Sequence, residues 1–119
     1  MPSDNKSILT EANAHVSRGD YEAFLACCTD DTHWTFVGDR VLVGKDAVRR
    51  YMAEAYEQPP VFTTTDLLAE GDFVTAIGEI TLIEQGRPTR YAYCDVWKLR
   101  DGKLAELRAF VINQPTDTD

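Results

Sequence analysis

The stretch YAYCDVWKLRDGKLAELRAF, residues 91–110, decides the predicted fold, because its pattern predicts two β-strands joined by a tight Asp-Gly turn. Side chains alternate between the two faces of a strand, so Tyr93, Asp95 and Trp97 should share one face. A carboxylate among aromatic side chains is costly to bury unless it is used or paired. Asp95 is therefore the first candidate for a functional residue.

The chain divides into a helical first half and a strand-rich second half. Apolar residues at helical spacing predict three helices, over 5–18, 20–28 and 45–57. Residues 29–31 predict a break, which is followed by a short strand pair over 33–37 and 41–43. Alternating β-branched and aromatic residues between turn signals predict four longer strands, over 61–69, 73–83, 87–100 and 103–113. Helices followed by strands indicate an α+β fold with the helices on one face of the sheet.

The composition is that of one small globular domain. All 119 residues, 1–119, fit a single domain, in which 114–119 predict a flexible tail. The net charge of -8 and the pI of about 4.6 argue against binding to nucleic acid or to an anionic membrane, because both need clustered Lys and Arg. No apolar run predicts a membrane span, and the N-terminus does not look like a signal peptide. Three cysteines, two of them adjacent, indicate reduced thiols and a cytoplasmic protein.

Three segments together resemble the nuclear transport factor 2-like superfamily, and within it the SnoaL-like and ketosteroid isomerase-like domains, a group that includes polyketide cyclases. They are GDYEAFLACCTDDTHWTF at 19–36, VGKDAVRRYM at 43–52 and CDVWKLRDGKLAELRAF at 94–110. The resemblance implies a cone, in which three N-terminal helices pack in a strongly curved mixed, mostly antiparallel sheet and leave an apolar pocket. It also implies a homodimer through the convex face of the sheet, where the apolar side chains of Cys94, Val96 and Ile83 are expected.

The resemblance and strand alternation together place one set of side chains inside the cone. The lining residues expected from the strands are Trp34, Phe36, Ile80, Tyr93, Trp97, Leu107 and Ala109. Tyr51 and Tyr56 of the third predicted helix are expected at the pocket mouth, where a hydroxyl can bond a polar ligand atom. The alternative is that both tyrosines are ordinary core aromatics.

Asp95 matches the position of an Asp that ketosteroid isomerases keep protonated, so that it donates a hydrogen bond to a developing oxyanion. Burial among aromatic rings would raise the pKa of Asp95 in the same way. The rest of that site does not carry over, because Phe36 stands where those enzymes have their general-base Asp and Ala12 where they have their oxyanion-hole Tyr. The pattern of limonene epoxide hydrolases fails as well, since Ala109 occupies one of their Asp positions. Neither specific activity is expected.

His15 is the second candidate catalytic residue, because it follows the apolar stripe of the first predicted helix and an imidazole titrates near neutrality. Alternatively, His15 is a half-buried helix residue, or Asp95 is a buried acid that His15 or a Tyr hydroxyl satisfies. The sequence contains no HxH, HExxH or Gly-rich phosphate loop, so neither a metal site nor a cofactor is expected.

These features predict a pocket for a small, mostly apolar molecule that carries a carbonyl or hydroxyl group. Asp95 would act as acid or hydrogen-bond donor in a cofactor-free isomerase or cyclase reaction that proceeds by proton transfer. The alternative function is a non-catalytic module for ligand binding or dimeric protein interaction. In that case the cone is a packed core and Asp95 is satisfied internally.

Overall fold

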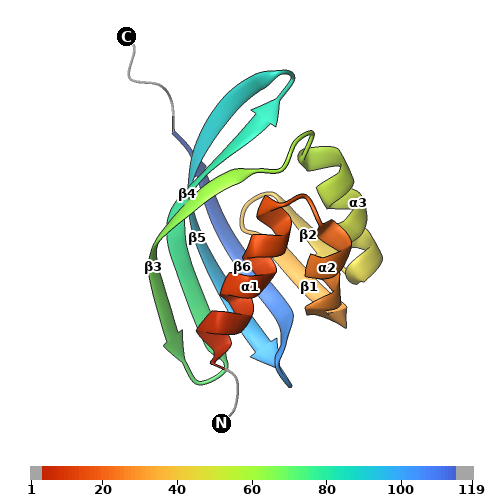
Figure 1. Cartoon of the computed structure of the whole chain (residues 1–119), viewed down its shortest axis with the longest axis vertical. Coiled ribbons are helices and arrows are strands. Elements are labelled where there is room, and N and C mark those ends of the chain that lie inside the picture. The colour runs from red at the N-terminus through yellow and green to blue at the C-terminus, as the bar shows by residue number, and fades with distance from the viewer. Residues whose placement is uncertain (1–3, 115–119) are drawn as a thin grey trace.

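The computed structural model describes residues 4–114, which fold into three helices and one six-stranded sheet. The helices are α1 (Asn5–Ser17), α2 (Tyr21–Ala26) and α3 (Lys45–Ala55). The strands are β1 (Cys28–Phe36), β2 (Arg40–Val43), β3 (Val61–Glu70), β4 (Phe73–Glu84), β5 (Arg87–Arg100) and β6 (Lys103–Asn113). The sheet bends strongly around the helices, which lie together on its concave face (Figure 1). The predicted α+β class is confirmed.

The sheet is mixed, with the strand order β2-β1-β6-β5-β4-β3. β1 runs parallel to β6, and every other neighbouring pair is antiparallel. The sheet does not close into a barrel, because β2 and β3 form its two edges. α1 packs against β3 and β4, and α3 packs against β1 and β2. The helices therefore cover the two halves of the concave face and leave the middle of the sheet facing the space between them (Figure 1).

The second helix is shorter than the sequence predicts. Asp20 caps its start by accepting a backbone N–H of the first turn at 3.2 Å, but the helix ends at Ala26. Residues 29–31, which the sequence predicts as a break, belong to β1. The cause is a partner far along the chain, since the Leu104 N–H of β6 donates to the Cys27 carbonyl at 2.9 Å. A local pattern cannot show a strand whose hydrogen bonds come from the other end of the sequence.

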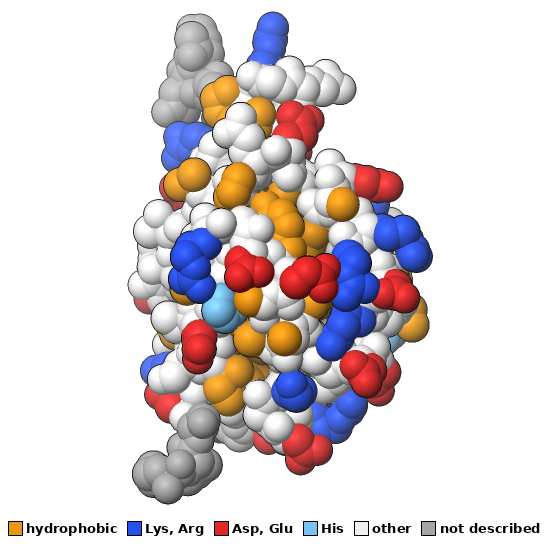
Figure 2. Space-filling model, turned by 45° about the vertical axis from the view of Figure 1, so that its right-hand side comes forward, with side chains coloured by type: hydrophobic (Ala, Val, Ile, Leu, Met, Phe, Trp, Pro, Cys, Tyr) orange, Lys and Arg blue, Asp and Glu red, His pale blue; other side chains and the backbone are white. Residues whose placement is uncertain are grey.

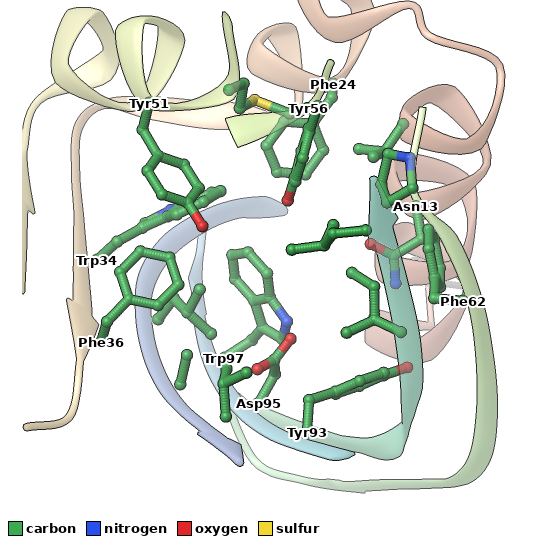
Figure 3. A pocket seen from close by; sticks show the side chains of 18 residues that line it. Asn13, Phe24, Trp34, Phe36, Tyr51, Tyr56, Phe62, Tyr93, Asp95 and Trp97 are labelled. Carbon is green, nitrogen blue, oxygen red and sulfur yellow. The ribbon is translucent and has the colours of Figure 1, made fainter. Parts of the chain in front are cut away.

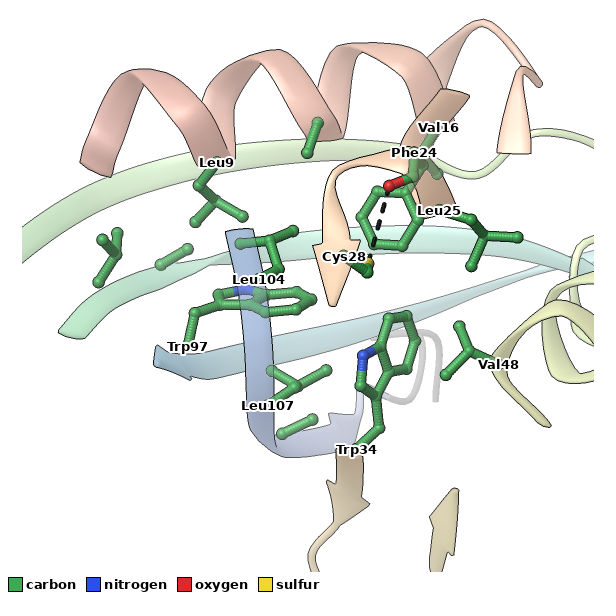
Figure 4. Close-up of a cluster of buried hydrophobic side chains, with 14 of the residues drawn as sticks. Leu9, Val16, Phe24, Leu25, Cys28, Trp34, Val48, Trp97, Leu104 and Leu107 are labelled. Carbon is green, nitrogen blue, oxygen red and sulfur yellow. Dashed lines mark hydrogen bonds between the residues drawn. The ribbon is translucent and has the colours of Figure 1, made fainter. Parts of the chain in front are cut away.

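The core fills one end of the cone with aromatic side chains in edge-to-face contact (Figure 4). The ring centroids of Phe24 and Trp34 lie 5.9 Å apart, and those of Trp34 and Trp97 lie 5.7 Å apart. Leu9 of α1 and Val48 of α3 are fully buried against this cluster. Such pairs stabilise a core beyond the area they bury. α1, α2, α3 and the middle strands together form this packed end. The rest of the concave face extends from it.

A close approach of two strands bends the sheet at Gly78 of β4. A Cβ atom at this position would lie 2.0 Å from the Thr63 carbonyl oxygen of β3, so only glycine fits. The register of β3 shifts directly beyond this point, between Thr64 and Asp66, which marks a β-bulge. The Tyr93 hydroxyl of β5 packs over Gly78 and lies 2.9 Å from Thr64 Oγ1. The bulge and this hydrogen bond hold the curvature that gives the concave face its depth.

The predicted tail over 114–119 lies outside the described residues, apart from Gln114, whose N–H donates to the Arg90 carbonyl at 2.8 Å. Between residues 4 and 114, none of the helices is long and apolar enough to cross a membrane.

Candidate functional site

A cavity of about 110 Å³ lies on the concave side of the sheet, between the middle strands and the helices (Figure 3). Its wall is mostly apolar and aromatic, and a few polar groups converge on it. Of the site residues predicted from the sequence, only His15 does not line this cavity. The others do, namely Trp34, Phe36, Tyr51, Tyr56, Ile80, Tyr93, Asp95, Trp97, Leu107 and Ala109. We call it the inner cavity.

Asp95 sits at the middle of the inner cavity on β5. Its neighbours across the sheet are Ala76 of β4 and Ala109 of β6, whose small side chains leave space beside the carboxyl group. Asp95 is partly buried, and its carboxyl group makes no hydrogen bond to any other residue in 4–114. Burial raises the pKa of Asp95 to about 7 because the charged form is poorly solvated there. Both protonation states are therefore populated near neutral pH.

Two tyrosine hydroxyls point toward the inner cavity from the helical side (Figure 3). Tyr51 belongs to α3 and Tyr56 is its C-cap residue. Neither hydroxyl has a hydrogen-bond partner among the described residues, and burial raises the pKa of both, so both stay protonated. The Tyr93 hydroxyl differs, because it is already bonded to Thr64 at 2.9 Å. Tyr51 and Tyr56 can thus offer hydrogen bonds to a ligand, whereas Tyr93 serves as wall.

Asn13 of α1 lines the inner cavity and is not among the site residues predicted from the sequence, whereas the predicted His15 does not line it. At about 100° of turn per residue, Asn13 lies about 40° from Leu9 around the helix, and His15 lies about 120° away on the other side. Leu9 is fully buried, so Asn13 borders the inner cavity while His15 faces away. His15 Nδ1 instead lies 2.6 Å from Nη2 of Arg18. The buried face of α1 also includes Ala12 and Val16, so Asn13 and His15 lie on opposite borders of one stripe and the sequence alone does not separate them.

The chemistry available in the inner cavity is that of one weak acid among neutral polar groups. Asp95 is the only carboxyl or imidazole group among the lining residues, all of which belong to the described part of the chain. The Trp34 indole N–H, in the cavity wall, is buried and has no partner there. Within residues 4–114, no group of three or more metal-ligating side chains comes together. The arrangement can donate a proton or hydrogen bonds to an oxygen of an apolar ligand and can take a proton back.

Comparison with known proteins agrees with this architecture. A model of the SnoaL-like domain matches residues 9–107, most of the chain. A comparison with functionally curated proteins gives no match.

Several solved structures share the fold. The epoxide hydrolase/cyclase-like enzyme SalBIII, which acts in pyran ring formation in the polyether salinomycin, is 24% identical with a TM-score of 0.80, over 90% of this chain and 89% of its own. A candidate ketosteroid isomerase from Kribbella flavida is 17% identical with a TM-score of 0.79, over 97% and 82%. A candidate polyketide cyclase from Xanthomonas campestris is 16% identical with a TM-score of 0.78, over 89% and 88%. At these identities the likeness shows a common nuclear transport factor 2-like fold and leaves the activity open.

Proposed function

Since this chain belongs to the SnoaL-like domain family, we propose that it binds a small, mostly apolar molecule with a carbonyl or hydroxyl group and acts on it as an isomerase or cyclase without a cofactor. One observation carries the proposal. Asp95, flanked by two alanines in the sheet, faces the inner cavity with no partner in residues 4–114, and its pKa is raised to about 7. A buried acid without a partner is costly to keep, so a ligand group that pairs with it explains its presence.

The proposed chemistry uses both protonation states of Asp95. The neutral carboxyl donates its proton to a carbonyl oxygen of the substrate while a nucleophilic atom of the same molecule attacks the carbonyl carbon. The proton that this atom loses on forming the new bond returns to the Asp95 carboxylate, so the cycle balances without a co-reactant. The Tyr51 and Tyr56 hydroxyls add hydrogen bonds to the oxygen on which negative charge develops.

A thermal-shift screen tests ligand binding. The panel consists of small cyclic enones, phenols, aromatic ketones, quinones, terpenoids and steroids, measured with wild type, Asp95→Asn and Asp72→Asn. Asp72 lies in the exposed turn between β3 and β4, outside the inner cavity, and controls for loss of a carboxyl group. A ligand at a hundred times its dissociation constant should stabilise the wild type by about 2.7 kcal/mol. We expect one oxygen-bearing class to do so, with most of the effect lost in Asp95→Asn and kept in Asp72→Asn.

Stabilised classes are then assayed for isomerised or cyclised products. Product formation that Asp95→Asn abolishes supports the enzyme proposal. Equal stabilisation of wild type and Asp95→Asn by every binding class would contradict the role of Asp95.

A second candidate function is binding without catalysis. The observation that favours it is that Asp95 stands alone, since the wall of the inner cavity contains no other carboxyl or imidazole group within the described chain. Most proton-transfer enzymes pair an acid with a base. Ligand stabilisation that depends on Asp95, with no product from any stabilised class, is the result that this alternative predicts.

We also propose that two copies of the chain associate through the convex face of the sheet. Ile77 of β4, Cys94 of β5 and Phe110 of β6 are register neighbours and form an apolar row across this face. Ile77 is 36% and Phe110 is 39% exposed, which favours a covering partner. Light scattering should give twice the chain mass of 13.4 kDa. Phe110→Lys should yield the monomer, and Val43→Lys on the edge strand β2 should not.

A further inference from the structure

The inner cavity is small, about 110 Å³, and it shares five lining residues with a second cavity. We propose that the ligand has two parts: a single-ring head with the carbonyl or hydroxyl group in the inner cavity, and a larger hydrogen-bond-donating or cationic part in the second cavity. Ala109 lies between the two cavities, and its small side chain keeps the passage between them open. This inference rests on the proposed function, because it takes Asp95 as the partner of the head.

The size of the inner cavity limits the head. An apolar cavity of about 150 Å³ in another protein holds one benzene molecule. The inner cavity measures about 110 Å³, so it has room for at most one small ring and for no fused ring system. Any ligand larger than this must continue outside the inner cavity.

The second cavity, which we call the outer cavity, measures about 450 Å³. It lies between the turn that joins β1 to β2, the C-terminal end of α3 and the hairpin of β4 and β5. Figure 2 shows apolar side chains at the bottom of a surface hollow that charged side chains border. Ile83, which strand alternation places on the convex face, borders the outer cavity because the hairpin twists beyond the body of the sheet. The outer cavity has room for several times the volume of the head.

The two cavities share five lining residues, which form a neck: Phe36, Tyr51, Leu82, Ala109 and Val111. The Phe36 and Tyr51 rings pack with centroids 5.0 Å apart and form one side of the neck. Ala109 is the smallest of the five and is only 2% exposed. It is also the register neighbour of Asp95, so a larger side chain here would enter the passage beside the carboxyl group.

The charges around the outer cavity select the second part of the ligand. Four carboxylates line it, namely Asp39, Glu54, Glu57 and Glu84, against the single guanidinium of Arg40. Arg40 is already engaged, 3.6 Å from Asp39 and over the Tyr51 ring. Glu84 accepts the Tyr91 hydroxyl at 2.7 Å, which orients one carboxylate on the hairpin. The excess of negative charge favours ammonium and hydroxyl groups and disfavours carboxylate and phosphate.

The outer cavity shares its neck residues with the inner cavity, which contains an unpaired carboxyl and two unpaired tyrosine hydroxyls among the described residues. A ligand whose head pairs with Asp95 and whose chain extends through the neck would place its remaining atoms among these carboxylates.

Three probes with the same ring test the inference by isothermal titration: phenol, tyramine and 3-(4-hydroxyphenyl)propionate. Phenol is the head alone, tyramine adds an ammonium tail and the propionate adds a carboxylate tail. For wild type at low salt, tyramine should bind about tenfold more tightly than the propionate. Added salt should reduce this ratio, because exposed charges are screened.

Two variants locate the effect. Glu54→Gln/Glu57→Gln should bring the tyramine to propionate ratio close to one and leave the affinity for phenol unchanged. The control Glu11→Gln/Asp72→Asn removes the same charge from exposed sites outside both cavities and should keep the ratio. Ala109→Leu should weaken both tailed probes more than phenol. Glu54 and Glu57 lie on the surface, so the test with Glu54→Gln/Glu57→Gln does not depend on whether Ala109→Leu folds.

The outcomes separate the two proposals. If Asp95→Asn weakens phenol binding but the two tailed probes bind wild type with equal affinity, the two-part ligand is contradicted and the proposed function is not. An unchanged ratio in Glu54→Gln/Glu57→Gln overturns the role of the outer carboxylates. Phenol binding that is absent, or equal in wild type and Asp95→Asn, overturns both.

Discussion

The two ends of the concave face are built from the same strands. The closed end is packed with aromatic side chains, whereas the open end contains polar groups that have no hydrogen-bond partner within the described chain. At the closed end, Trp97 packs edge-to-face against Trp34 and Phe24, and the three rings belong both to the packed core and to the wall of the inner cavity. Two residues along β5, Asp95 faces open space with no partner in the described chain. We therefore expect the closed end to determine the stability of the fold. The open end instead provides the Asp95 carboxyl and tyrosine hydroxyls, which can form hydrogen bonds with a ligand. The predictions below test this division.

The largest effect should come from removing an aromatic ring at the closed end. Trp97→Ala should lower the free energy of unfolding by about 3–5 kcal/mol, because the ring is 4% exposed and the cavity left behind cannot collapse. Phe36→Ala, at the neck, should lower it by less than about 2 kcal/mol, because the Phe36 side chain is only partly buried and loses fewer contacts than Trp97. Urea denaturation measures both. Equal losses would remove the distinction between the two ends.

Asp95→Asn should stabilise the protein, and only at high pH. The raised pKa of Asp95 means that the folded state binds more protons than the unfolded state between about pH 4 and pH 7. The free energy of unfolding of the wild type is therefore highest below this range and falls as the pH rises through it. Asn cannot ionise and escapes this loss. At about pH 8 the variant should be more stable by about 2–4 kcal/mol, and at about pH 4 the two should be equal. Urea denaturation across this pH range, with Asp72→Asn as control, measures the free energy of unfolding of each protein. A difference between wild type and Asp95→Asn that does not change with pH would contradict the account.

Gly78→Ala should lower the free energy of unfolding by about 1–3 kcal/mol, because the new Cβ would collide with the Thr63 carbonyl and push β3 away. The strand displacement should also weaken the hydrogen bond between Tyr93 and Thr64. Thermal unfolding gives the first effect, and amide hydrogen exchange along β3 gives the second. Unchanged exchange and stability would show that the sheet is not held at this point.

The smallest effect should come from the unpaired hydroxyl at the open end. Tyr51→Phe should change stability by less than about 0.5 kcal/mol, because no hydrogen bond within the described chain is lost. Tyr93→Phe is the matched control, and it should lose about 1 kcal/mol with its bond to Thr64. In titrations with phenol the order should reverse, with Tyr51→Phe weakening binding more than Tyr93→Phe. A larger stability loss in Tyr51→Phe would mean that its hydroxyl is paired in the folded protein.

Strand alternation predicts much of the open end correctly, because a strand has a fixed period of two. Once 91–100 is taken as one strand, Tyr93, Asp95 and Trp97 must share a face, and the aromatic content indicates the concave one. Helix α1 is harder, because its apolar stripe is wide and residues on its two borders look alike. His15 and Asn13 lie on opposite borders of this stripe, and only Asn13 lines the inner cavity.

Other features depend on contacts between distant parts of the chain. β1 begins earlier than predicted because β6 supplies its hydrogen bonds, and no local pattern contains that information. The outer cavity arises where a turn, a helix end and a hairpin meet, so neither its volume nor its excess of carboxylates follows from any one segment. The absence of a partner for Asp95 in the described chain likewise requires the positions of all its neighbours.

The most direct test of the account is the pKa of Asp95 in the folded protein, read from the pH dependence of its carboxyl ¹³C chemical shift. The account predicts a midpoint for Asp95 of about 7, which moves when phenol binds. A midpoint near the ordinary Asp value of about 4 would mean that the carboxyl is solvated or paired, and would contradict the central role given to it.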